Sequence, residues 1–120
     1  MRKKTILLVE DDQSLQFTLR CLIEDMGYEI VVATDHEQAV AALRGGPYAA
    51  AIVDYLIDNV PSSKFIAELQ RLHPQTPLVC STAAFAHQIQ LEEGSVPNAY
   101  LFKPFGTTEL RNTLQALIRN

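Results

Sequence analysis

The sequence predicts an α/β fold, a doubly wound sheet of five parallel strands with five flanking helices. Short apolar runs alternate along the chain with segments whose apolar residues recur every three or four positions, which is the pattern of strands alternating with helices. Some runs are apolar at every position, as in strands that helices cover on both faces. Strands joined through helices pair in parallel with right-handed crossovers. The 120 residues suit one domain, residues 1–120.

The first part of the chain has clear element boundaries. The first strand is expected at Ile6–Val9, and the helix after it ends at Gly27, because glycine is a common helix stop. Tyr28–Ala33 is rich in β-branched residues, which favours a second strand. Asp35 stands three positions before a glutamine, which predicts a capped second helix that extends through Leu43.

Three more strands and three more helices complete the pattern. The strands are expected at Ala49–Val53, Leu78–Ser81 and Ala99–Phe102. Ser62 or Ser63 is a candidate N-cap for the helix between the first two of these strands. A short helix is expected over Phe85–Glu93, and Thr107 is expected to cap the last helix.

Composition limits the classes of function. The formal net charge of −4 offers no basic surface for DNA or RNA. The basic N-terminal residues are followed by only four apolar ones, Ile6–Val9, which is too short for a signal peptide or a membrane span. Cys21 and Cys80 form no CxxC pair and lie in apolar stretches, which predicts buried thiols in a reducing compartment. These features indicate a cytoplasmic protein.

The carboxyl ends of the predicted strands carry the polar residues that suggest chemistry. In a doubly wound sheet the working site lies at these ends. The residues expected there are Glu10, Asp11 and Asp12 after the first strand, Asp54 after the third, Ser81 and Thr82 at the fourth, and Lys103 after the fifth. Neighbouring carboxylates repel one another unless a cation joins them, and oxygen-only ligands suit Mg²⁺. An ammonium and a hydroxyl can meet the charge of a phosphoryl group that a carboxylate attacks.

Each of these residues also has a simpler explanation when taken alone. The three acids after the first strand could be a solvated helix start, where negative charge favours the helix dipole. Asp54 could serve a turn, and hydroxyls at strand ends are common. Lys103 is more telling, because it follows an apolar strand and precedes a proline that restricts the turn. The agreement of four strand ends within one fold carries the prediction.

Four segments resemble the receiver-domain family of two-component signalling. They are Ile6-Leu7-Leu8-Val9-Glu10-Asp11-Asp12, Ala51-Ile52-Val53-Asp54, Ser81-Thr82-Ala83 and Tyr100-Leu101-Phe102-Lys103-Pro104-Phe105. The resemblance extends over essentially the whole chain. It implies a flavodoxin-like sheet with strand order 2-1-3-4-5.

The resemblance also implies roles for individual residues. Glu10 and Asp11, with Asp12 beside them, correspond to the Mg²⁺-binding acids, Asp54 to the phosphoacceptor, and Leu56 to the residue whose backbone carbonyl joins the metal. Thr82, or Ser81 in its place, corresponds to the switch hydroxyl, Lys103 to the lysine that contacts the phosphoryl group through a typically cis bond to Pro104, and Tyr100 to the aromatic that turns inward.

The family resemblance further implies the partners. A sensor histidine kinase or a histidine phosphotransfer protein donates the phosphoryl group, and an output partner binds the face formed by the fourth helix, fifth strand and fifth helix. The domain is then a switch that catalyses only its own phosphoryl transfer and dephosphorylation. We expect no direct contact with nucleic acid and no membrane association.

The loop after Asp54 departs from the family pattern and keeps two alternatives open. Asp58 and Ser62 stand where the family usually has a proline and a glycine. One alternative is therefore an adaptor that binds partners without phosphorylation. The other is a phosphohydrolase with an aspartyl nucleophile, although Asp54 and Asp58 are four positions apart rather than the two of the haloacid-dehalogenase-like pattern.

Overall fold

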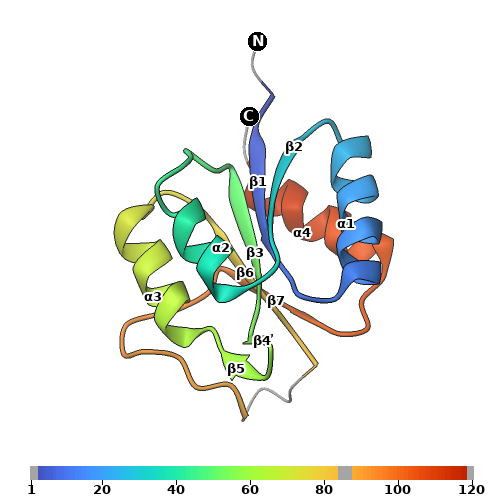
Figure 1. The fold of residues 1–120 in the computed structure, drawn as a ribbon. Helices are drawn as coiled ribbons and strands as arrows, with labels where there is room; N and C mark the ends of the chain where they lie inside the picture. The colour runs from blue at the N-terminus through green and yellow to red at the C-terminus, as the bar shows by residue number, and fades with distance from the viewer. Residues whose placement is uncertain (1–2, 84–87, 119–120) are drawn as a thin grey trace.

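A five-stranded parallel sheet forms the centre of the computed structural model, which describes residues 3–83 and 88–118 (Figure 1). Its strands are β1 (Thr5–Val9), β2 (Glu29–Ala33), β3 (Ala50–Asp54), β6 (Leu78–Thr82) and β7 (Ala99–Phe102). They lie in the order β2-β1-β3-β6-β7 with every neighbouring pair parallel. Counted along the chain, this is the expected order 2-1-3-4-5. The two remaining strands, β4 (Leu56–Ile57) and β5 (Val60–Pro61), form a small antiparallel hairpin outside the sheet.

Helices cover both faces of the sheet (Figure 1). The described residues contain α1 (Gln13–Asp25), α2 (His36–Ala42), α3 (Ser63–Leu72) and α4 (Thr107–Leu117). The helices α2 and α3 pack on one face of the sheet, and α1 and α4 pack on the other. Adjacent residues of a strand enter opposite layers, as Leu7 and Leu8 of β1 do. This explains why the predicted strands are apolar at consecutive positions.

Local capping signals agree with the structure in part. The Asp35 carboxylate accepts a hydrogen bond from the Gln38 backbone N–H, which confirms the predicted cap of α2. Gly27 has φ +95°, a left-handed conformation that suits a helix stop. The cap of α4 is Gly106, so Thr107 is the first helical residue rather than the cap. Ser62 precedes α3 but makes no side-chain cap bond, because its hydroxyl is used elsewhere.

The helix expected over Phe85–Glu93 does not extend through residues 89–92. Residues 84–87 lie outside the described residues, and residues 89–92 have no helical structure. Ile89 and Leu91 both pack against the core layer of α2 and α3. A spacing of two positions on one face belongs to extended chain and not to a helix. The segment instead crosses the sheet face as a strap, defined here as residues 88–98.

Only one of the two predicted buried thiols is buried. Cys80 lies inside β6, whereas Cys21 is exposed on α1. On α1 the sheet-facing residues are Leu19 and Ile23, and the position midway between them turns toward solvent. None of the helices in the described residues is both long and apolar enough to cross a membrane.

Candidate functional site

Three carboxylates meet at the carboxyl end of the sheet. Glu10 and Asp11 follow β1, and Asp54 is the last residue of the adjacent strand β3. One carboxylate oxygen from each of the three lies within 4.8 Å of the others. Glu10 is 1% exposed and Asp54 is 6% exposed, while Asp11 is half-buried. The cluster is therefore shielded on the protein side and open at Asp11.

Lys103 supplies the positive charge of the cluster. Its Nζ donates hydrogen bonds of 2.9 Å to Glu10 Oε1 and of 2.9 Å to Asp54 Oδ2. The residue follows β7, and its peptide bond to Pro104 is cis, as the family resemblance implied. Burial lowers the pKa of Lys103, but the hydrogen bonds and charges of Asp54 and Glu10 outweigh it, so the pKa is raised and the ammonium stays charged.

One lysine does not neutralise three carboxylates, and the excess negative charge is visible in the raised pKa of Glu10. Burial, assisted by the charge of Asp54, raises the pKa of Glu10 to about 7 even though Lys103 and the backbone N–H of Asp12 lower it. A second cation at the cluster would relieve this repulsion. The donor atoms are all carboxylate oxygens, which are the ligands that Mg²⁺ prefers. The residues present therefore fit a Mg²⁺ ion.

Asp12 and Leu56 occupy different places from the cluster acids. The Asp12 carboxylate accepts a 3.0 Å hydrogen bond from the Leu15 backbone N–H and so caps α1, outside the group of three carboxylates. Leu56 begins β4, and its N–H donates a 3.3 Å hydrogen bond to Asp54 Oδ1. Both Asp54 oxygens therefore accept a hydrogen bond in this structure.

The hydroxyl and aromatic residues of the predicted switch lie on the two strands beyond Asp54. Ser81 is the register partner of Asp54, and both Ser81 and Thr82 are buried at the end of β6. Tyr100 lies on β7 with 39% of its surface exposed, and its ring stacks on Phe102 with centroids 5.8 Å apart. Tyr100 thus faces outward in this conformation.

Tyr55, Asp58 and Ser62, in the loop after Asp54, make hydrogen bonds around the site that the sequence did not predict. The Ser62 hydroxyl donates a 2.7 Å hydrogen bond to the Asp54 backbone carbonyl, and the Ser62 N–H donates one of 2.7 Å to Tyr55 O. At the tip of the β4–β5 hairpin, the Asp58 N–H donates a 2.8 Å hydrogen bond to Asp11 Oδ2. The hairpin is therefore tied to both the acceptor and a cluster acid.

Tyr55 links the same loop to the strap. Its ring is buried, and its hydroxyl accepts a 3.0 Å hydrogen bond from Gln90 N and donates one of 3.3 Å to Gln90 O. Gln70 of α3 holds the strap again by a 2.9 Å bond to Val96 O. The residue next to Asp54 is thus connected to the segment where the sequence predicted a helix.

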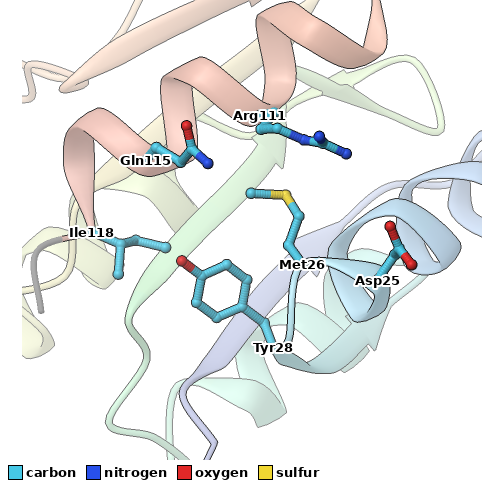
Figure 2. A pocket seen from close by; sticks show the side chains of 6 residues that line it. All are labelled: Asp25, Met26, Tyr28, Arg111, Gln115 and Ile118. Atoms are coloured by element: carbon cyan, nitrogen blue, oxygen red, sulfur yellow. The ribbon is translucent and has the colours of Figure 1, made fainter.

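A separate hollow lies away from these residues. Figure 2 shows Met26 and Tyr28 extending into the space beneath α4, from which Arg111 and Gln115 project. Met26 and Tyr28 lie between the end of α1 and the start of β2, at the sheet edge opposite the carboxylates. This hollow therefore has no part in the cluster's chemistry.

Comparison with known proteins places the chain in a family. Residues 6–115 match the family model described as the response regulator receiver domain. The transcriptional regulatory protein TcrA of Mycobacterium tuberculosis is 33% identical over 116 residues, which are 95% of this chain and 46% of that protein. CpxR of Klebsiella pneumoniae is 33% identical over 117 residues, 95% of this chain and 49% of that protein. The chain spans about half the length of these relatives.

Solved structures show the same fold. The receiver domain of the sensor histidine kinase PA1611 from Pseudomonas aeruginosa has a TM-score of 0.84 at 26% identity, with 98% of each chain covered, and it holds a magnesium ion in its active-site cleft. The CheY-like receiver domain protein from Methanospirillum hungatei has a TM-score of 0.87 at 20% identity, covering 96% of this chain and 93% of that one.

Proposed function

The chain belongs to the response-regulator receiver domain family, and we propose that it is a signalling switch that accepts a phosphoryl group on Asp54. We assign the metal site to Glu10, Asp11, Asp54 and the backbone carbonyl of Leu56, with Asp12 confined to capping α1. Receiver domains are signalling domains rather than classical enzymes, and we propose that this one catalyses only its own phosphorylation and dephosphorylation.

The observation that carries this proposal is the setting of the Asp54 carboxylate. It lies at the carboxyl end of β3, beside two other carboxylates that together with it fit Mg²⁺. Its Oδ2 accepts a hydrogen bond from the Lys103 ammonium. In the proposed step an Asp54 oxygen forms a bond to phosphorus while the bond from phosphorus to the donor breaks, and the donor leaves with that electron pair. Lys103 meets the phosphoryl charge, and bound Mg²⁺ would neutralise phosphoryl oxygens.

The proposed switch uses the hydroxyl and the aromatic residue beyond Asp54. The new dianion would attract the Thr82 hydroxyl, with Ser81 as the alternative. Tyr100, which is exposed in this conformation, would then turn inward. Phosphorylation would shift the populations of two conformations of β7 and the elements around it.

The proposed donor is a sensor histidine kinase or a histidine phosphotransfer protein in the cytoplasm. The proposed output surface lies on β7 and α4. It differs from the expected face because residues 89–92 of the strap are not helical. We propose no direct contact with nucleic acid or membrane, since the formal net charge is −4.

The test is phosphorylation by a small donor. The protein is incubated with acetyl phosphate or phosphoramidate, with Mg²⁺ or with EDTA, and its intact mass is recorded beside that of Asp54→Asn. We expect a gain of one phosphoryl group that requires Mg²⁺ and disappears in the variant. A gain that survives in Asp54→Asn would show that the acceptor is another residue.

A second candidate function is an adaptor that binds partners without phosphorylation. The Asp58 backbone N–H donates a hydrogen bond to Asp11 Oδ2, so one oxygen of this cluster acid already has a partner without metal. Isothermal titration with Mg²⁺ distinguishes the two functions. Saturable binding that Asp54→Asn weakens supports the switch, whereas an absence of both Mg²⁺ binding and phosphorylation supports the adaptor.

A further inference from the structure

A second hollow of about 520 Å³ lies between α2 and α3, on a face that the proposed switch does not use. Its apolar lining comes from Val40, Leu43, Phe65 and Leu72. Val40 is 56% exposed and Leu72 is 45% exposed. Large apolar side chains that gather around a hollow on the surface mark sites of interaction more often than single exposed ones do. We call this hollow the α2–α3 groove.

The groove exists because each helix carries more apolar surface than the sheet covers. On α2 the buried Ala39 faces the sheet, while the exposed Val40 lines the hollow that α2 shares with α3. On α3 the sheet side is formed by Ile66 and Leu69, and Leu72 turns away from it. The two helices lie side by side in Figure 1. Their outer apolar edges therefore form one continuous depression.

Two cations flank this apolar lining, one toward each end. Lys64 is in the first turn of α3, and Arg44 follows the last residues of α2. Within residues 3–83 and 88–118 neither side chain forms an ion pair. The acid on the rim, Glu68, is already paired with Arg71. The two positive charges are therefore available to a ligand.

Lys64 is not placed to favour the dipole of α3. A positive charge in the first turn of a helix opposes the helix dipole, and no carboxylate in the described residues lies within ion-pair distance of Lys64. The chain as a whole has a formal net charge of −4. An acidic ligand is thus repelled by most of the surface and attracted at the α2–α3 groove.

From this charge complementarity we propose that the α2–α3 groove binds an acidic amphipathic helix of a partner protein. Apolar residues on one face of that helix enter the groove at spacings of three and four. Carboxylates toward the two ends of that helix pair with Lys64 and Arg44. This interaction requires no phosphorylation of Asp54.

The test uses two designed helical peptides with a fluorescent label. Both peptides carry the same leucines on one face of the helix. Glutamates stand at both ends of one peptide, and lysines stand at the same positions of the other. Fluorescence polarisation measures affinity, and ¹H–¹⁵N chemical-shift mapping locates binding. We expect the glutamate peptide to bind about tenfold more tightly, equivalent to about 1.4 kcal/mol, with shifts confined to α2 and α3. Leu72→Ser should weaken this binding.

A charge exchange provides the decisive control. The variant Arg44→Glu/Lys64→Glu should reverse the preference in favour of the lysine peptide. The matched variant Arg20→Glu/Arg111→Glu changes net charge equally on the other face of the sheet and should preserve the preference. Circular dichroism of each variant verifies that it is folded.

Equal binding of both peptides, no binding of either, or chemical shifts outside the groove would overturn the proposal. Self-association in sedimentation velocity that Leu72→Ser abolishes would identify a second copy of the chain as the occupant instead. Displacement of the peptide by citrate, with the same shifts, would identify a small-anion site.

Discussion

Replacing Lys103 by methionine should destabilise the metal-free protein strongly. The Lys103 ammonium is the only cation hydrogen-bonded to the cluster within the described residues, and it bonds both Glu10 and Asp54 at 2.9 Å. Glu10 is 1% exposed and Asp54 is 6% exposed. Methionine preserves most of the side-chain volume but leaves both carboxylates buried without a cation.

The size of the effect follows from this burial. Removing one partner of a buried ion pair costs about 3–5 kcal/mol. The Lys103 side chain is 21% exposed, which places the expected loss near the lower end, about 3 kcal/mol. For a domain of this length such a loss lowers Tm by roughly 12 °C.

The assay is urea unfolding at pH 8 in EDTA, where Glu10 is mostly ionised. Lys64→Met is the matched control, because Lys64 is exposed and forms no ion pair with a described residue, and it should change stability by less than about 0.5 kcal/mol. The loss in Lys103→Met should shrink at pH 5.5, since a proton on Glu10 then replaces the lysine charge. It should also shrink in Mg²⁺.

Two results would refute this reasoning. A loss no larger than that of Lys64→Met would show that the carboxylates do not depend on the ammonium. A loss that is the same at both pH values and unaffected by Mg²⁺ would show that packing, rather than charge, is what methionine disturbs.

Three further predictions concern other residues of the fold and site. In EDTA, the pKa of Glu10 is near its ordinary 4.5 in the unfolded chain and about 7 in the native protein, so ionisation of Glu10 lowers the free energy of unfolding as pH rises between these values. Urea midpoints measured against pH should lose this decrease in Glu10→Gln. A pH profile that is the same in the variant would contradict the prediction. Ser62→Ala should lower the free energy of unfolding by about 1–2 kcal/mol, because the Asp54 backbone carbonyl loses its buried hydrogen-bond donor. In urea unfolding, the neighbouring Ser63→Ala should lower it by less. Mass spectrometry of native protein treated with N-ethylmaleimide should show one addition, at the exposed Cys21. Cys80 should not react, because it is buried, and this burial together with the charge of Asp54 raises the pKa of its thiol to about 12. Two rapid additions without denaturant would argue against a closed core.

The elements of the sheet were predictable because their signals are local. Runs such as Ile6–Val9 are apolar on both faces, and the structure places adjacent residues of that run in opposite core layers. The predicted strands agree with the structure to within one residue at each end. The Asp35 cap needs only a short spacing to be recognised. The positions of Glu10, Asp54 and Lys103 follow because parallel strands all end at one edge of the sheet.

The loop after Asp54 carries a local signal for a hairpin, an element that was not among those predicted. Asp58 and Asn59 stand between apolar pairs, and both have positive φ, of 52° and 61°. Two such residues between short strands are typical of a tight hairpin turn. The hairpin itself was therefore predictable, but its attachment to Asp11 was not.

Local sequence patterns were enough to place the five strands of the sheet, the helices α1 to α4 and the acids and lysine at the carboxyl ends of the strands. The contacts between segments distant in sequence became visible in the folded chain alone. Asp58 reaches Asp11 across 47 positions, and Tyr55 reaches Gln90 across 35. Residues 89–92 are extended rather than helical, contrary to the prediction, because Ile89 and Leu91 both pack against the core layer of α2 and α3 in that conformation. The spacing of apolar residues indicates which side of a segment faces the core. Contacts between distant segments depend in addition on where the rest of the chain lies.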